Sequence, residues 1–339
     1  MNICLIGPKG IAGGCIRLNE VNKFLVKQGF NVEIFYTSNI LRLNKNKQNR
    51  QSTFKVNHDF LKYLKKTKFD AVISIENGHI FLDHLDALKD TLKVFFCEAP
   101  FSDEYYYVYA SNHSYAKGFN IQSLNDIRRL KEEEINIFEN CDHVIFPWET
   151  YEEYTRKYVY SDKKLKTIRF GCTPADKKVS YFYPTSMIYL GSLERYYTNS
   201  KLLAYLTKIN PNIIDIYGSP KPNPKYNLRY KGVAKSLDVF YDYQFGLNTV
   251  SKDKLRQLAF SCKILSYLSY GLPTFFPEWQ KFPKEMKGCI SYNEDNFIEK
   301  FERFSEKEMW EKKSNEAYEQ AKNLDWNLTL HPLLKILNK

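Results

Sequence analysis

A lysine near the start of a predicted helix is the feature of this sequence that most directly suggests chemistry. Ser261 and Lys263 open an amphipathic run that closes on Gly271-Leu272-Pro273, a helix stop signal. The N–H groups and the positive dipole end of a helix N-terminus favour an anion, and Lys263 adds a full charge. Ser266, one turn further on, adds a small polar side chain. The pattern predicts a site for a diphosphate and a ribose, with a glycine-capped core helix as the alternative.

A glycine turn is a second candidate for phosphate binding. Gly191, Ser192 and Arg195 lie where a predicted strand beginning at Met187 ends. Glycine lets a ligand approach the backbone closely, and arginine can make paired contacts to phosphate oxygens that lysine cannot. The alternative for Arg195 is an ordinary solvent-exposed arginine.

Two carboxylates could act as a general base. Glu98 and Asp103 follow the predicted strand 94–96. Ligands bind beyond the carboxyl ends of strands in open parallel sheets, and a carboxylate there can accept a proton from an attacking hydroxyl. Asp103 is the preferred catalytic residue and Glu98 the second candidate. Glu104 is the third acid of this loop, and two of the three could be plain surface residues.

The glycines near the N-terminus do not predict a dinucleotide site. Gly7, Gly10 and Gly13 follow a strand and open a helix, but their spacing is G-x-x-G-x-x-G rather than G-x-G-x-x-G. The next strand ends at Tyr36-Thr37-Ser38, without the acidic residue that would hold a ribose. Gly13 and Gly14 could instead allow a substrate close to the backbone.

Alternating strands and helices must position these residues. Strand, glycine loop, helix and strand over residues 2–36 form a βαβ unit, which predicts an α/β fold with parallel strands. A second series restarts near residue 187, after an aperiodic stretch at 171–184 that predicts an interdomain linker. Further strands are predicted at 71–75, 94–96, 143–147, 213–217, 228–230, 245–248 and 274–276. At 339 residues, two domains of similar size are expected.

The charge of the chain predicts anionic partners. Lysine and arginine outnumber aspartate and glutamate by 50 to 39, a formal net charge of +11. Basic residues gather at 42–68 and at 156–169. Nucleotide diphosphates, an anionic membrane surface or nucleic acid would all fit, and the two clusters could equally be solvated faces.

The cysteine and histidine patterns predict no metal site. The seven cysteines lack any C-x-x-C spacing, and the six histidines lack the H-E-x-x-H spacing of a zinc site. The scattered cysteines favour a reducing compartment. Without a visible signal peptide or an apolar run of about 18 residues, a cytoplasmic protein is expected, soluble or peripheral on the inner face of the cell membrane.

The run from Ser261 to Thr274, with Phe245-Gly246-Leu247-Asn248 before it, resembles the nucleotide-sugar helix of GT-B glycosyltransferases. In that helix a lysine, two apolar residues, a polar residue and Tyr-Leu lead to Gly-Leu-Pro. The resemblance covers most of the chain and implies two Rossmann-like domains facing a cleft. Residues 1–172 would bind acceptor, with 325–339 crossing back to them. Residues 185–324 would bind the nucleotide sugar.

Within that fold, the resemblance favours one group of families. The large retaining subfamily carries glutamates at the positions of Ser266 and Leu258, and both are absent here. The Ser-x-Lys-x-x-polar arrangement is similar to the glucuronosyltransferase and group 1-like families of bacterial polysaccharide assembly. The glucuronosyltransferases are inverting, monotopic membrane enzymes with an aspartate base in the N-terminal domain.

The resemblance also implies a role for each candidate residue. Lys263 would contact the diphosphate, and Ser261 and Ser266 the nucleoside side. The implied donor site comprises Gly191, Ser192, Arg195, Asn248, Ser261, Lys263 and Ser266. The glycine loop with Gly13 and Gly14 would contact the acceptor.

The expected function is that of a bacterial or viral hexosyltransferase. It would move a sugar from a nucleotide-sugar donor, preferably a UDP-sugar, to a glycan or lipid-linked acceptor with inversion and without a metal cofactor. A phage-type DNA glucosyltransferase would also explain the basic charge. A nucleotide-sugar epimerase and a non-enzymatic nucleotide-binding protein are the remaining alternatives.

Overall fold

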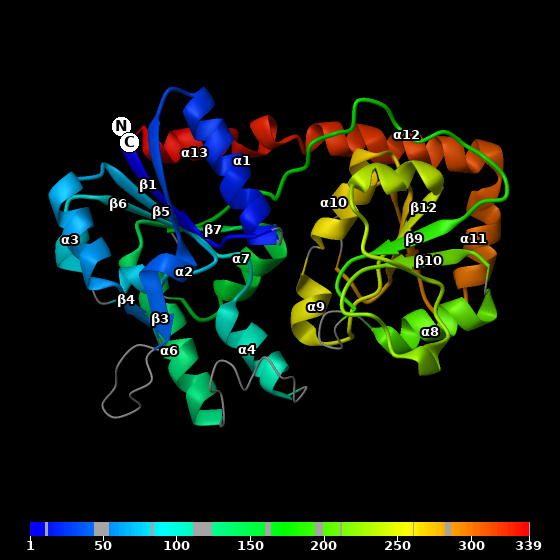
Figure 1. Cartoon of the computed structure of the whole chain (residues 1–339), viewed down its shortest axis with the longest axis horizontal. Coiled ribbons are helices and arrows are strands. Elements are labelled where there is room, and N and C mark those ends of the chain that lie inside the picture. Colours follow the sequence, from blue (N-terminus) through cyan, green and yellow to red (C-terminus); the bar gives the residue numbers. More distant parts are fainter. Residues whose placement is uncertain are drawn as a thin grey trace. The chain divides into compact units, whose positions relative to one another are not determined.

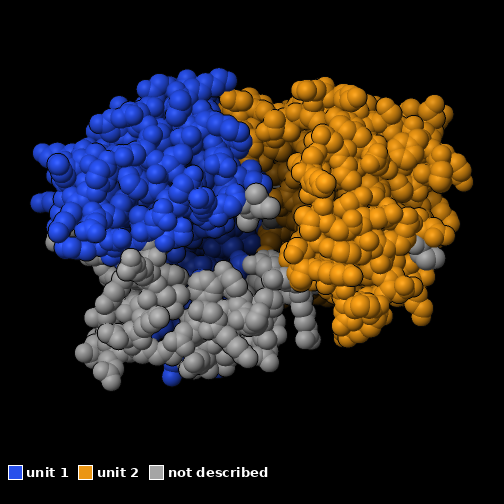
Figure 2. All heavy atoms as spheres, in the orientation of Figure 1, with its two compact units in different colours: residues 1–170, 329–339 blue, residues 171–328 orange. Residues whose placement is uncertain are grey.

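The computed structural model describes residues 1–10, 13–43, 54–82, 85–110, 124–159, 164–193, 199–210, 212–259, 261–281 and 286–338. The chain divides into two compact units, drawn in blue and orange in Figure 2. Unit 1 comprises Met1–Phe170 and Thr329–Lys339, and unit 2 comprises Gly171–Leu328. Each unit is built around one six-stranded parallel sheet, with helices on both faces (Figure 1).

Unit 1 contains the sheet β2-β1-β5-β6-β7-β8. Its strand β5 is buried at every residue, and β7 at all but its first, which explains why the sequence shows them as continuous apolar runs. The elements, in chain order, are β1 (Asn2–Gly7), α1 (Gly13–Lys27), β2 (Asn31–Tyr36), α2 (Thr37–Ile40), β3 (Leu41–Leu43), β4 (Phe54–Val56), α3 (His58–Thr67), β5 (Ala71–Ile75), the 3-10 helices η1 (His79–Phe81) and η2 (Leu85–Leu88), β6 (Leu92–Phe96), α4 (Phe101–Ala110), α6 (Leu124–Asn140), β7 (His143–Phe146), α7 (Glu149–Thr155) and β8 (Leu165–Thr167).

The chain reverses its direction of travel across this sheet between β1 and β5. It runs outward from β1 to β2 and then returns to pair β5 with the other side of β1. Open parallel sheets bind ligands beyond the carboxyl ends of the strands at such a switch point. In unit 1 this edge carries the loop from β1 to α1 and the residues that follow β5 and β6.

Unit 2 repeats the plan with the sheet β11-β10-β9-β12-β13-β14. Its switch point lies between β9 and β12, which pair through Met187 with Phe245 and through Ile188 with Gly246. The elements are β9 (Met187–Leu190), α8 (Ser200–Ile209), β10 (Ile214–Tyr217), η4 (Pro224–Tyr226), β11 (Tyr230–Gly232), η5 (Leu237–Asp242), β12 (Phe245–Leu247), α9 (Lys254–Leu258), α10 (Cys262–Ser269), β13 (Thr274–Pro277), β14 (Cys289–Tyr292), α11 (Phe297–Ser305), α12 (Lys307–Asn323) and α13 (Trp326–Leu337), whose residues from Thr329 onward belong to unit 1.

A buried tyrosine bridges β9 and β12 where they diverge. The backbone N–H of Leu190 donates to the Tyr267 hydroxyl at 2.8 Å, and that hydroxyl donates to the carbonyl of Leu247 at 3.3 Å. Gly246 makes room for the ring, since a Cβ there would lie 2.4 Å from Tyr267 Cγ. Tyr267 therefore fixes α10 against the switch point of unit 2.

The predicted fold class is confirmed: both units are α/β with parallel sheets. The stretch 171–184, expected to be a linker, is packed on unit 2. Its backbone N–H groups at Cys172, Ala175 and Val179 donate to the carbonyls of Leu324, Ser269 and Tyr270. This stretch has no periodicity because its hydrogen bonds go to a helix end and to loop carbonyls rather than to a ladder.

Candidate functional site

The structure brings Lys263 and Gly191 together at the carboxyl edge of the sheet of unit 2. Lys263 is the second residue of α10, and Gly191 follows β9 directly. The lysine side chain lies across the glycine, because a Cβ at Gly191 would be 2.7 Å from Lys263 Cδ. Lys263 Nζ donates to the hydroxyl of Tyr189 at 3.0 Å and lies 4.5 Å from the centroid of that ring. A half-buried ammonium group is thus fixed at the switch point.

The turns after β9 and β10 are in close backbone contact. Gly191 and Gly218 have φ of +150° and +156°, a region that side chains disfavour. A Cβ on Gly218 would lie 1.8 Å from the carbonyl oxygen of Gly191. Leu193 N donates to Ser219 O at 3.0 Å, and the carbonyl of Ser192 accepts from the Tyr189 hydroxyl at 2.8 Å. This contact shapes the turn over which Lys263 lies.

We expect Gly218→Ala to lower the free energy of unfolding of unit 2 by about 2–3 kcal/mol, because the new methyl group meets a backbone oxygen that cannot move freely. Gly232→Ala is the matched control. Gly232 also has a positive φ, +99°, but a Cβ there meets nothing within 4 Å, so the expected loss is about 1 kcal/mol. Urea unfolding of both variants measures the difference. Equal losses would contradict the close approach of the two turns.

The structure also describes three other predicted donor residues. Ser261 is the N-cap residue of α10, but its side chain makes no capping hydrogen bond. The Ser266 hydroxyl donates back to the carbonyl of Cys262 at 3.3 Å. Asn248 is buried and donates to Gln280 Oε1 at 2.7 Å. Arg195 lies outside the described residues.

In unit 1, the glycines at the start of α1 contact a carboxylate that the sequence analysis did not single out. Glu76 follows β5, and its Oε1 accepts a hydrogen bond from Gly14 N at 3.0 Å. A Cβ on Gly14 would lie 2.1 Å from this oxygen, so only glycine permits the approach. Gly13, also predicted to contact acceptor, is the first residue of the same helix. The signal for Glu76 was present: a carboxylate directly follows the predicted strand 71–75.

The protein environment raises the proton affinity of Glu76. Burial among protein atoms and the nearby negative charge of Glu98 raise the pKa of Glu76 to about 7, while the hydrogen bond from Gly14 opposes the shift. Much of the residue is nevertheless exposed to solvent, and water screens these effects in part. The direction of the shift makes Glu76 a stronger base than an ordinary glutamate.

Glu98, the second catalytic candidate, forms a buried ion pair with Arg17 of α1. Arg17 Nε lies 2.9 Å from Glu98 Oε1, and the side chains are 0% and 16% exposed. The guanidinium also donates to Ile168 O at 3.1 Å and stacks on Phe170. Burial raises the pKa of Glu98 above its ordinary value, and the charge of Arg17 offsets only part of this rise. The pair joins α1 to the end of β6.

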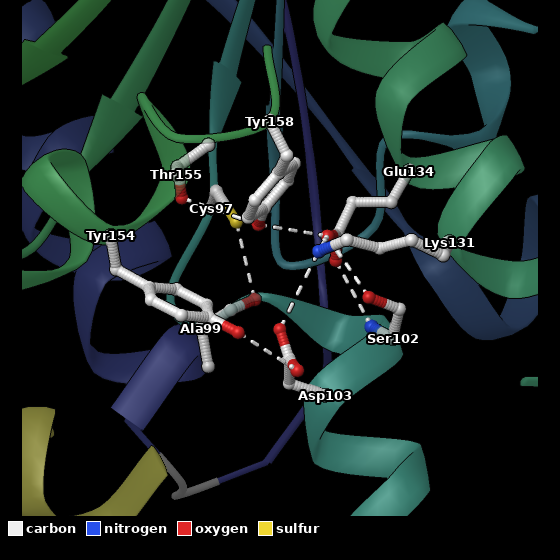
Figure 3. Close-up of polar contacts among 9 residues, drawn as sticks. All are labelled: Cys97, Ala99, Ser102, Asp103, Lys131, Glu134, Tyr154, Thr155 and Tyr158. Carbon is white, nitrogen blue, oxygen red and sulfur yellow. Dashed lines mark hydrogen bonds and ion pairs between the residues drawn. The ribbon is translucent and has the colours of Figure 1, made fainter. Parts of the chain in front are cut away.

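Asp103, the preferred catalytic candidate, lies in the first turn of α4 and makes two contacts (Figure 3). The Tyr154 hydroxyl donates to Asp103 Oδ1 at 3.1 Å. Lys131 Nζ lies 3.5 Å from Asp103 Oδ2. The aspartate side chain is 25% exposed, so solvent reaches it.

A second carboxylate, Glu134 of α6, is fully buried beside Asp103 (Figure 3). It accepts hydrogen bonds from the backbone N–H and the hydroxyl of Ser102, both at 3.0 Å. Lys131 and Tyr158 donate to it at 2.9 and 3.1 Å. Glu134, on the neighbouring helix α6, therefore provides a hydrogen-bond acceptor for donors in the first turn of α4.

Neither a metal site nor a membrane span is found in the described part of the chain. No group of three or more His, Cys, Asp or Glu side chains there could hold a metal ion. Among the same residues, no helix combines the length and the apolar character needed to cross a bilayer.

Comparisons with known proteins identify the fold. No protein-family model matches the chain, and no curated protein matches it in sequence. Solved structures match it over its whole length. HepE from Anabaena, in complex with UDP-glucose, has a TM-score of 0.67 at 10% identity and covers 100% of this chain and 99% of its own.

Two further structures give similar scores. The lipopolysaccharide outer core galactosyltransferase WaaB has a TM-score of 0.65 at 14% identity, with 100% and 99% of the chains covered. An alpha-glucosyltransferase in complex with UDP and a 13-mer DNA containing an HMU base has a TM-score of 0.60 at 13% identity, with 100% of both chains covered. The chain therefore has the two-domain GT-B fold that the sequence motif implied.

Proposed function

We propose that this chain is a glycosyltransferase that uses a nucleotide-sugar donor, specifically a UDP-sugar. The observation that carries the proposal is the lysine fixed across Gly191, at the switch point of a parallel sheet and beside a helix N-terminus. A diphosphate bound there would meet an ammonium group, the backbone of a glycine turn and the positive end of α10.

The same groups suit the chemistry of glycosyl transfer. As the bond from the anomeric carbon to the diphosphate breaks, negative charge develops on the leaving oxygen. A preorganised cation and helix N-terminus stabilise that charge more than they stabilise the bound donor. Lys263 is preorganised by the hydrogen bond to Tyr189 and by its contact with Gly191. Ser261 and Ser266 are assigned to the nucleoside side.

Two of the similar structures support a UDP-sugar as the donor, because they hold UDP-glucose or UDP. Their likeness to this chain is in fold, so the nucleotide comes to this chain as part of the proposal. Asn248 is assigned a supporting role, because its side chain is committed to Gln280, whose Nε2 donates to Ala259 O just before α10.

We assign the acceptor to unit 1 and propose a glycan or a lipid-linked glycan, as WaaB acts on lipopolysaccharide outer core by its name. A DNA acceptor is the second candidate. It is favoured by the structural likeness to a glucosyltransferase solved with DNA and by the net charge of +11. Inversion at the anomeric carbon is proposed with the carboxylates of unit 1 as candidate bases.

Contact with an anionic membrane surface is a finer part of this proposal. It rests on the basic residues at 42–68 and 156–169, of which 44–53 and 160–163 lie outside the described residues. In the second cluster, Arg156 and Arg169 form ion pairs with Glu152 and Glu149, which reduces the charge they offer to lipid.

A donor panel followed by an acceptor panel tests the proposal. Binding of UDP-, GDP-, CMP- and dTDP-sugars is measured by calorimetry, and UDP-sugars are expected to bind most tightly. Transfer is then measured to a soluble glycan, to a lipid-linked acceptor in neutral or anionic vesicles, and to duplex DNA. Transfer to DNA alone would select the second candidate. Donor turnover to an isomeric nucleotide sugar without acceptor would indicate an epimerase, and binding without any turnover would contradict an enzyme.

A further inference from the structure

We propose that Glu76 is the general base that accepts the proton of the attacking acceptor hydroxyl. This inference rests on the proposed glycosyltransferase function and assigns the base to a residue outside the sequence-based candidates Asp103 and Glu98. It is carried by the position of Glu76, by its backbone conformation and by its contact with α1.

Glu76 lies at the switch point of the sheet of unit 1. It directly follows β5, which pairs with β1 on one side and with β6 on the other. Its backbone N–H donates to Phe96 O at 2.9 Å, so the residue is fixed against the end of β6. Its carboxylate reaches across to Gly14 in the first turn of α1. A ligand at this edge of the sheet would meet Glu76.

The backbone at Glu76 is in a conformation that glutamate does not favour. Its φ of +66° is left-handed, where glycine or asparagine is usual. Keeping a glutamate there costs about 1 kcal/mol relative to a relaxed residue, and such strain is often retained where a side chain must be aimed. Two hydrogen bonds hold this conformation, one from the backbone N–H of Glu76 to Phe96 O and one from Gly14 N to the Glu76 carboxylate.

The charges around Glu76 suit a base that works near neutral pH. Glu98 and Glu104 both raise the pKa of Glu76, after the larger effect of burial. Arg17 of α1 is paired with Glu98. A base whose pKa lies near the working pH is both deprotonated and strong enough to take a proton.

The other two candidate carboxylates, Glu98 and Asp103, are engaged in contacts with protein side chains. Protonating Glu98 would leave the fully buried Arg17 without its counter-ion, which is costly. Asp103 already accepts a hydrogen bond from Tyr154 and lies 3.5 Å from Lys131 Nζ, so both of its carboxylate oxygens are engaged by protein groups. Glu76 is exposed and has one backbone donor, so a hydroxyl can approach its carboxylate.

The proposed step is a single displacement. The acceptor O–H bond breaks and its proton moves to the Glu76 carboxylate. The freed electron pair of the acceptor oxygen forms the bond to the anomeric carbon of the donor. The bond from that carbon to the diphosphate oxygen breaks, and its electron pair leaves with UDP. Attack from the face opposite the leaving group inverts the anomeric configuration, and Glu76 then releases its proton to water.

The test compares Glu76→Gln with Asp103→Asn and Glu98→Gln in the full chain, after a donor and an acceptor have been found. Glutamine keeps an oxygen for Gly14 N but cannot accept the acceptor's proton. We expect Glu76→Gln to lower kcat by about two to four orders of magnitude. UDP affinity, measured by calorimetry, should be unchanged. The fall in kcat that we expect for the wild type below about pH 7 should be absent from the variant.

Stability provides the readout that separates a base from a structural residue. A carboxyl whose folded pKa is raised above its unfolded value favours folding while it is protonated, and this contribution is lost as pH rises through the folded pKa. Glu76→Gln should therefore be at least as stable as the wild type at pH 8. A variant unfolded at that pH would overturn the proposal.

The remaining outcomes are also decisive. Full transfer in Glu76→Gln with loss in Asp103→Asn would give the role to Asp103, and loss in Glu98→Gln alone would give it to Glu98. If Glu76→Gln were slow but its kcat still fell below about pH 7, Glu76 would position the acceptor without taking its proton. Wild-type protein that binds no nucleotide sugar would instead refute the function on which the proposal rests.

Discussion

Lys263→Ala is expected to weaken UDP binding by about 30- to 1000-fold, which corresponds to about 2–4 kcal/mol. The ammonium group is half-buried and held by Tyr189, so water and salt screen its charge less than that of an exposed lysine. Removing it would take a fixed positive charge away from the diphosphate. Calorimetry with UDP on wild type and variant measures the loss.

Two variants control for the other effects of this substitution. Lys312→Ala removes the same charge from an exposed position on α12 of unit 2 and should leave the affinity unchanged. Lys263→Arg keeps the charge but must fit a bulkier group over Gly191, so an intermediate loss is expected. Unchanged affinity in Lys263→Ala would mean that α10 is a structural helix, which was the alternative interpretation of its sequence.

The sequence predicted the parts of the fold that depend on local patterns. Strands such as β5 are buried on both faces and appear as continuous apolar runs, and Gly-Leu-Pro marked the end of α10. The resemblance assigned Gly191 and Lys263 to the same donor site, but their direct contact joins distant parts of the sequence and no local pattern contains it. The α/β class could be predicted from the order of the strands and helices alone.

The carboxylate environments could not be predicted in the same way. Glu76 and Gly14 are 62 residues apart in the sequence, so no local pattern predicts their contact. The positive φ of Glu76 is also not predictable, because a glutamate in the sequence does not indicate this conformation. The ion pair between Arg17 and Glu98 is likewise long-range. Sequence reasoning placed Glu98 and Asp103 correctly after β6, but a strand end cannot reveal which carboxylate is paired and which is open.

The network around Glu134 carries the largest expected effect on stability. Glu134→Leu would leave the N–H and hydroxyl of Ser102 and the hydroxyl of Tyr158 without their acceptor in a buried place. Removing one partner of a buried charged network costs about 3–5 kcal/mol. We expect the free energy of unfolding of unit 1 to fall by that amount.

Hydrogen exchange on α4 and α6 would localise the effect, because those helices are joined by this carboxylate. Glu134→Gln is the matched control. Its amide keeps one oxygen for Ser102 but places an N–H₂ group against Lys131 or Tyr158, so a smaller loss of about 1–3 kcal/mol is expected. UDP affinity should be unchanged in both variants, because Lys263 and Gly191 belong to unit 2. If exchange in α4 stayed at the wild-type level in Glu134→Leu, the start of that helix, and with it Asp103, would have to be held by other contacts.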